Sequence, residues 1–170
     1  MNMTREERLR RALAKEDEEK SFYLQAASGA RNVFAKRIFE ELALEEDLHE
    51  KRVLEIFEGL KKDEAFKKWI TTVRGPSKLE ELFHTISTEK AERCEDDICA
   101  LKTGLEMEEK SVVHYETLAQ AAENIYEKRL YLTLAYEERG HYLRVMDAIE
   151  YLSDPVGWHY IHQRSMVDGG

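Results

Sequence analysis

Apolar residues recur at alternating spacings of four and three over several stretches of the chain, which is the spacing of one face of an α-helix. One such stripe runs from Leu101 to Ala122 and another from Leu134 to Leu152. Helix breakers are scarce, because the chain has two prolines and three of its eight glycines lie in the last fourteen residues. The pattern predicts four long helices, at about Thr4 to Ser28, Asn32 to Leu60, Glu89 to Ala122 and Asn124 to Leu152.

Residues that favour helix ends stand at these boundaries. Asn32 and Asn124 are predicted N-caps, because their side-chain oxygens can accept hydrogen bonds from the first free N–H groups of a helix. Gly29 is predicted to end the first helix in the left-handed conformation that glycine adopts readily.

The segment from Lys61 to Thr88 contains Gly75-Pro76 and is predicted to be a long crossover, with a short helix near Lys78 to Ile86. Short turns on either side of it give two helical hairpins. The fold class is therefore all-α, a four-helix bundle over residues 1–153 with a C-terminal tail at 154–170.

The stripe of the first predicted helix is less regular than the others, because Lys20 stands on it between Glu16 and Tyr23. Either this helix is rotated slightly, or Lys20 extends along its stem to water. The other three stripes are apolar except at one level. The polar residues at that level are Glu46 and His49, Glu108, and Glu138 and His141.

The chain repeats itself once, at an offset of 92 residues and without a gap. Each half reads Glu, then Tyr seven residues later, then Glu-x-x-His beginning thirty residues after the first Glu. The common offset argues against coincidence, and two copies of a hairpin make a bundle rather than a solenoid. The matching pairs are Glu16 and Glu108, Tyr23 and Tyr115, Asn32 and Asn124, Leu42 and Leu134, Glu46 and Glu138, and His49 and His141.

The polar residues of each hairpin fall at one depth. Glu16 lies 13 residues before Gly29 and Glu46 lies 17 after it, so both stand some 20–25 Å from the turn at ~1.5 Å per residue. Antiparallel helices then place Glu16 beside Glu46 and His49. The same reasoning places Glu108 beside its Glu-x-x-His pair.

Four carboxylates at one level of an apolar core need a countercharge, because burying an unpaired charge costs several kcal/mol. Two divalent cations would neutralise all four, and inward Glu and Glu-x-x-His residues on four helices are the pattern of di-iron and di-manganese carboxylate bundles. Oxygen-rich ligation with two imidazoles suits iron or manganese better than copper or zinc.

Composition excludes several classes of partner. The net charge of −9 argues against nucleic acid, whose phosphates need a basic face. No stretch reaches the ~20 apolar residues of a membrane span, and the N-terminus has no signal-peptide pattern. Cys94 and Cys99 fit neither a metal knuckle nor a disulfide framework, which favours two reduced thiols in a cytoplasmic protein.

The same residues resemble the rubrerythrin family of ferritin-like proteins over about Ala12 to Leu152. The resemblance implies a ferritin-like bundle with two iron ions, manganese or a mixed pair being the alternative. It also implies a homodimer that reduces hydrogen peroxide or, less efficiently, dioxygen. The implied ligands are Glu16, Glu46, His49, Glu108, Glu138 and His141. The matching pieces are Glu16 with Phe22-Tyr23, Leu44 to His49, Glu108 through Tyr115, and Tyr136 to His141.

Two departures from the family matter. Rubrerythrins proper carry a rubredoxin module with two Cys-x-x-Cys knuckles, which this sequence lacks, so electrons are expected from a separate donor such as a rubredoxin-type protein. The family often places a further carboxylate one turn after the glutamate that corresponds to Glu108 in the third predicted helix, but Ser111 is near that position here. Glu19 stands at the equivalent position of the first predicted helix, 92 residues before Ser111, and is predicted as a seventh ligand.

Tyr23 and Tyr115 are predicted to hydrogen-bond a ligand carboxylate and so fix its orientation. The alternative is a core tyrosine whose hydroxyl is satisfied elsewhere. A third Glu-x-x-His, Glu81 to His84, falls in the crossover and is interpreted as surface or packing. His114 lies off the stripe, and His159 and His162 in the tail have no acidic partner in register.

Two further functions stay open at this stage. The bundle could bind or oxidise iron for storage or delivery without turning over peroxide, although no acidic run marks an entry path. It could also be a metal-free scaffold whose acids lie on surfaces.

Overall fold

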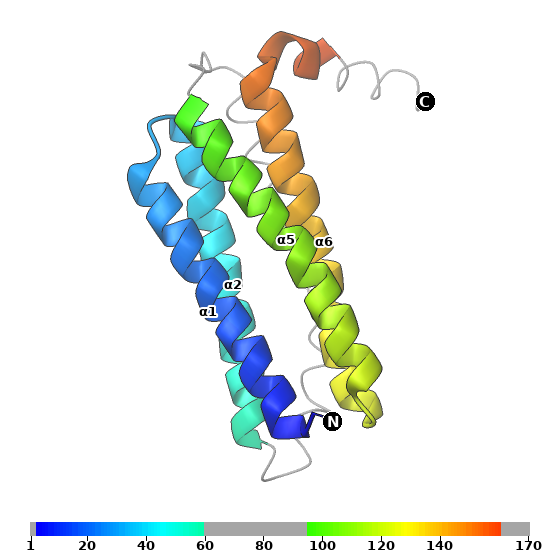
Figure 1. Ribbon diagram of the computed structural model, residues 1–170. Helices are drawn as coiled ribbons and strands as arrows, with labels where there is room; N and C mark the ends of the chain where they lie inside the picture. The colour runs from blue at the N-terminus through cyan, green and yellow to red at the C-terminus, as the bar shows by residue number, and fades with distance from the viewer. Residues whose placement is uncertain (1–2, 60–94, 161–170) are drawn as a thin grey trace.

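The chain folds into antiparallel helices in a computed structural model that describes residues 3–59 and 95–160. Their order is α1 (Arg5–Gly29), α2 (Val33–Gly59), α5 (Glu95–Ala121) and α6 (Ile125–Ser153). α1 and α2 form one hairpin, α5 and α6 form the second, and the hairpins lie side by side (Figure 1). The described residues contain no strand, and the predicted all-α bundle is confirmed.

Some predictions fall on other parts of the chain. The crossover with its short helix, the third Glu-x-x-His motif, Cys94 and His162 all lie outside the described residues. Residues 155–160, at the start of the predicted tail, are helical. None of the described helices has the length and hydropathy that a membrane span requires.

Side-chain caps fix where the helices begin. Thr4 and Glu7 form a capping box on α1, in which Glu7 N donates to Thr4 Oγ1 over 3.2 Å and Thr4 N donates to Glu7 Oε2 over 2.7 Å. Asn124 Oδ1 accepts from the first N–H groups of α6. Asn32 Oδ1 accepts from Phe34 N at 2.8 Å, so both asparagines act as predicted.

The turn between α1 and α2 differs from its prediction. Gly29 does not adopt a positive φ, and Ala30, which caps the C-terminus of α1, is extended, with φ −65° and ψ 133°. The N–H groups after it are satisfied from another helix, because the Asp97 carboxylate of α5 accepts from Arg31 N at 3.1 Å and Asn32 N at 2.6 Å. A buried long-range acceptor therefore replaces the local glycine cap.

α1 is rotated relative to its predicted stripe. Ala12 and Glu19 are fully buried, whereas Leu13 and Lys20 on the neighbouring row are only partly buried. The Lys20 ammonium forms ion pairs with Glu50 and Asp47 of α2, at the edge of the hairpin. The seam of α1 therefore runs through Glu19 rather than through Lys20.

Two apolar clusters fill the bundle, one toward each end. The first gathers around Tyr23, Phe39 and Tyr151, and the second around Leu9, Tyr115 and Tyr131. The buried glutamates and histidines belong to neither cluster. The polar level predicted from the stripes is therefore a layer bounded by apolar packing.

A buried ion pair joins α1 to α6 at the end of the bundle where the N-terminus lies (Figure 1). Arg8 Nε donates to Glu127 Oε1 over 2.6 Å, and Arg8 Nη2 donates to Oε2 over 2.9 Å. The Tyr131 hydroxyl donates to the same carboxylate over 3.2 Å. The positions related by the 92-residue repeat are apolar, namely Ala35, Phe39 and Ala100.

Replacing Glu127 by Gln is expected to lower the free energy of unfolding by about 3–5 kcal/mol, because it leaves a buried guanidinium without its countercharge. Urea unfolding measures the loss. Glu6→Gln is the control, since the Glu6–Arg10 pair is 62% and 66% exposed and is expected to contribute less than about 1 kcal/mol. Equal losses in the two variants would contradict the assignment.

Candidate metal centre

The structure brings all six predicted ligands together in the buried polar layer, and each is at most 3% exposed. Their ligand atoms form two groups, and within each group one atom per residue lies within 4.8 Å of the others. Glu46 and Glu138 belong to both groups. The first group is Glu16, Glu46, His49 and Glu138, and the second is Glu46, Glu108, Glu138 and His141.

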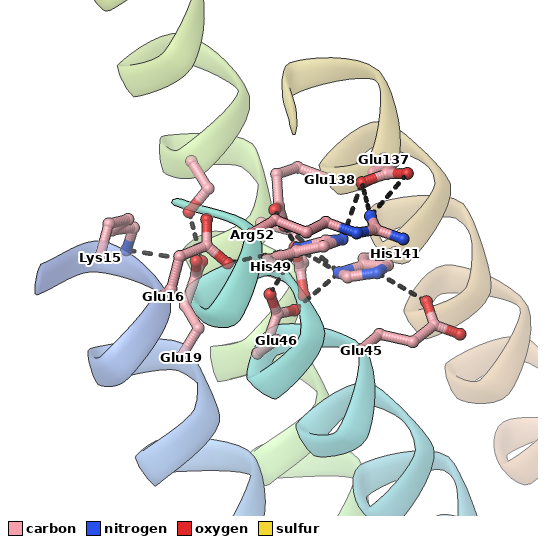
Figure 2. Close-up of polar contacts among 12 residues, drawn as sticks. Lys15, Glu16, Glu19, Glu45, Glu46, His49, Arg52, Glu137, Glu138 and His141 are labelled. Carbon is pink, nitrogen blue, oxygen red and sulfur yellow. Dashed lines mark hydrogen bonds and ion pairs between the residues drawn. The ribbon is translucent and has the colours of Figure 1, made fainter. Parts of the chain in front are cut away.

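Both imidazoles turn the same nitrogen, Nδ1, toward the carboxylates. The rings of His49 and His141 are stacked, with centroids 5.4 Å apart and planes 8° from parallel (Figure 2). His49 Nδ1 lies 3.1 Å from Glu46 Oε2, 3.2 Å from Glu16 Oε2 and 3.3 Å from Glu138 Oε1. His141 Nδ1 lies 2.7 Å from Glu46 Oε1, 3.2 Å from Glu138 Oε2 and 3.7 Å from Glu108 Oε2. Each Nδ1 therefore faces three carboxylates and is the atom placed to bind a metal.

The other ring nitrogen of each histidine meets a carboxylate from the opposite hairpin. His49 Nε2 lies 2.9 Å from Glu137 Oε2, and His141 Nε2 lies 2.9 Å from Glu45 Oε2. Figure 2 shows both carboxylates on the side of the rings away from Glu46. A carboxylate on the far nitrogen of a ligating histidine fixes the ring orientation and leaves the near nitrogen free to bind a metal.

Arginines hold these outer carboxylates in turn. Arg52 contacts Glu137, and Arg144 contacts Glu45. Sequence reasoning gave none of these four residues a role. The available signal was the repeat, because Glu45 and Glu137, like Arg52 and Arg144, are related by the same offset of 92.

The two tyrosines also act across the hairpins. The Tyr23 hydroxyl donates to Glu108 Oε1, and the Tyr115 hydroxyl donates to Glu16 Oε1. Both tyrosines are fully buried. Each hydroxyl thus fixes one carboxylate oxygen of a predicted ligand and leaves the other oxygen, Oε2, facing the layer.

Glu19 is influenced electrostatically by Glu138 and Glu46 but belongs to neither ligand group. Its side chain is fully buried, its Oε1 accepts a hydrogen bond from the Ser111 hydroxyl, and Lys15 Nζ lies 3.5 Å away. Its Oε2 has no hydrogen-bond partner among the described residues. Ser111 and Glu19 are related by the repeat, so the contact joins equivalent positions of the two halves.

The remaining histidines stand apart from the layer. His114 is half-buried beside Tyr115, and His159 packs edge-on against Tyr151 and Trp158. Within the described ranges, neither belongs to a group that could hold a metal.

Comparison with known proteins agrees with this geometry. The rubrerythrin family model matches residues 7–149. The chain belongs to the rubrerythrin family. A hypothetical protein from Pyrococcus furiosus has a similar fold, with a TM-score of 0.64 and 22% identity over 88% of this chain and 90% of that one. A search of curated protein sequences found no match.

The donor set of this rubrerythrin-family chain fits a pair of metal ions. Five buried oxygens of the four ligand glutamates have no hydrogen-bond partner among the described residues, although buried polar atoms are normally paired. A cation between them would satisfy all five. They are Glu16 Oε2, Glu46 Oε1, Glu108 Oε2 and both oxygens of Glu138.

Burial is the largest influence on the pKa values of Glu16, Glu108 and Glu19. It raises the pKa of Glu16 from 4.5 to about 8, against the opposing influence of His49. Burial likewise raises the pKa of Glu108 and of Glu19 well above the usual value. Without metal ions, burial therefore favours the protonated form of these carboxyls.

The histidines and the shared glutamate respond differently. Burial opposes charge on His49 and His141, but the carboxylates around each ring together outweigh it and raise each pKa well above 6.5. Burial raises the pKa of Glu138, but the two imidazoles lower it further, to well below 4.5. Protonated imidazoles therefore supply positive charge at the positions where metal ions would bind.

Gly104 of α5 makes room for Tyr23. A Cβ at this position would lie 3.2 Å from Tyr23 Cε1 and 3.2 Å from its hydroxyl. Gly104→Ala is expected to lower the free energy of unfolding by about 1–3 kcal/mol, because the added methyl group would force a shift of the buried Tyr23 ring, whose hydroxyl is bonded to Glu108. Gly140→Ala is the matched control, since a Cβ there meets nothing within 4 Å, and it is expected to stabilise by about 0.5–1 kcal/mol. Thermal unfolding compares them, and a gain in both would contradict the role of Gly104.

Proposed function

We propose that this chain is a di-iron oxidoreductase that reduces hydrogen peroxide, and dioxygen less efficiently, with electrons from a separate donor such as a rubredoxin-type protein. The observation that supports it is the pair of overlapping ligand groups that share Glu46 and Glu138. When bound, the metal pair supplies the two electrons that break the O–O bond of peroxide, and two protons complete two water molecules.

The ligand roles follow from the two groups. Glu46 and Glu138 would contact both metal ions. Glu16 and His49 would hold one ion, and Glu108 and His141 would hold the other. Oxygen-rich sites with imidazole suit iron and also manganese, so iron is proposed from the family and manganese remains the alternative occupant.

Other residues hold the ligands in place. Tyr23 restrains one oxygen of Glu108, and Tyr115 restrains one oxygen of Glu16. The apolar clusters on both sides of the layer exclude bulk water, which strengthens electrostatic interactions inside it. Glu19 is proposed as a seventh ligand, because its Oε2 is buried without a hydrogen-bond partner among the described residues while Ser111 holds only Oε1.

Rapid mixing of the anaerobic ferrous protein with hydrogen peroxide tests the proposal. We expect ferric absorbance to appear much faster than in a Glu46→Ala, Glu138→Ala variant, which lacks both shared ligands. A Glu40→Gln, Glu116→Gln variant, altered at two exposed positions, is the matched control and should match the parent. Oxidation of the parent no faster than that of the double alanine variant would refute the proposal.

The same preparation separates the proposal from iron storage. Peroxide reduction predicts two iron ions per chain and repeated turnover with an external reductant. More than two iron ions per chain, with oxidation but no turnover, would favour iron storage or ferroxidase activity instead.

A further inference from the structure

The arginines hold the two outer carboxylates in different ways. Arg144 grips Glu45 with two nitrogens, since Nη1 donates to Oε1 over 2.8 Å and Nη2 donates to Oε2 at a shorter distance. Arg52 reaches Glu137 through Nη1 alone, at 3.2 and 3.4 Å from its two oxygens. Typical N–H···O hydrogen bonds span about 2.7–3.2 Å. The first contact is therefore a fork of two hydrogen bonds, and in the second a single nitrogen is shared at longer distances between the two oxygens.

Solvent exposure does not account for this difference. The side chains of Arg52 and Glu137 are 21% and 23% exposed, and those of Arg144 and Glu45 are 15% and 30% exposed. Water therefore screens both pairs to a similar extent. The difference lies in geometry, because only a planar fork aligned with a carboxylate fixes both of its oxygens.

The fork bears directly on the histidine behind it. A fixed Glu45 holds His141 Nε2, which leaves His141 Nδ1 oriented toward the ligand carboxylates. The closest carboxylate oxygen is 2.7 Å from this Nδ1, compared with 3.1 Å for His49. A ligand that is already oriented loses less conformational freedom on binding, and outer partners of this kind alter metal affinity by about 10–100-fold.

We propose that the two metal positions are unequal, and that the position capped by His141 binds its ion more tightly and fills first. This inference rests on the proposed function in requiring that the layer bind metal. A chain holding one ion lacks the partner needed for a two-electron step. The weaker position, capped by His49, would therefore decide at what metal concentration the protein becomes active.

Cobalt(II) titration of two single variants tests the proposal, with absorbance and calorimetry as readouts. His49→Ala keeps the position capped by His141, and His141→Ala keeps the other. We expect the first variant to bind one cobalt ion about 10-fold more tightly than the second. Equal affinities, or the reverse order, would overturn the proposal.

The arginines give a second measurement that does not depend on losing a ligand. Arg144→Lys keeps the charge but cannot form the fork, so it should weaken the tighter step of cobalt binding by about 10-fold. Arg52→Lys is the matched control and should change binding much less. Equal effects of the two lysine variants would also overturn the proposal. Failure of the parent to bind any cobalt, manganese or iron would instead refute the proposed function itself.

Discussion

Loading the protein with two divalent ions is expected to raise its free energy of unfolding by about 8 kcal/mol when free metal is a thousandfold above the dissociation constants. A ligand that binds only the folded chain stabilises it by about 4 kcal/mol per site under these conditions. The layer offers two such sites, because its ligands come from four helices and meet only after folding. Thermal and urea unfolding with manganese or anaerobic ferrous iron, against the chelated protein, measure the difference.

The variants of the shared ligands sharpen this measurement. A Glu46→Gln, Glu138→Gln variant should unfold at the same temperature with and without metal. The exposed Glu40→Gln, Glu116→Gln variant should keep the full shift. Unchanged stability of the parent on chelation would show that the buried carboxylates are neutralised by protons alone.

The metal-free protein is expected to lose stability as the pH rises from about 5 to about 8. The pKa of Glu16 is about 8 in the folded chain and 4.5 as a reference, so the folded state holds a proton that the unfolded chain releases. Stability from such a group is complete below the lower value and falls by about 1.4 kcal/mol per pH unit above it. Glu16 alone therefore accounts for a loss on the order of 5 kcal/mol.

Other titrating groups of the layer also favour a loss of stability as the pH rises. The raised pKa values of Glu108, His49 and His141 act in the same sense. Burial raises the pKa of Glu138, but the two imidazoles lower it to well below 4.5. The stability that ionised Glu138 contributes is therefore lost only when the pH falls below about 4.5. It does not offset the loss at higher pH.

Urea unfolding of the chelated protein at several pH values checks this prediction. Glu16→Gln removes one titrating carboxyl and should flatten the decline. The metal-loaded protein should show a weaker decline or none, because metal binding requires deprotonated ligands and strengthens with pH. A metal-free protein that becomes more stable between pH 5 and 8 would contradict the assignment.

The bundle and the membership of the polar layer could be predicted because two independent signals coincided. The spacing of apolar residues gave four helices, and the 92-residue repeat selected the same level on each. Glu108 illustrates this, since it is the one carboxylate on an otherwise apolar stripe. Caps such as Asn32 are local, so their role was also readable from the sequence.

The rotation of α1 was one of two alternatives that the sequence left open. Lys20 stood on the predicted stripe with Glu19 beside it, and only tertiary packing shows that Glu19 is buried and that Lys20 pairs with α2. The turn after Gly29 was mispredicted for a similar reason. Its backbone donors are met by Asp97, a residue more than sixty positions away, which no local pattern reveals.

The outer partners of the histidines were missed for a different reason. Glu45 and Glu137 repeat at the right offset, but the repeat alone does not say which histidine each one meets. Each carboxylate contacts the imidazole of the opposite hairpin rather than its own. That exchange depends on how the hairpins pack, which is a property of the assembled bundle.

This exchange means that neither half of the molecule is self-sufficient. The hairpin of α1 and α2 carries His49 but not the carboxylate that steadies it, and Glu16 but not the tyrosine that restrains it. A single hairpin would have to pair with another of its kind before any of its ligands was held as it is in the whole chain. The complete centre therefore forms only when the two hairpins are packed against each other in the correct register.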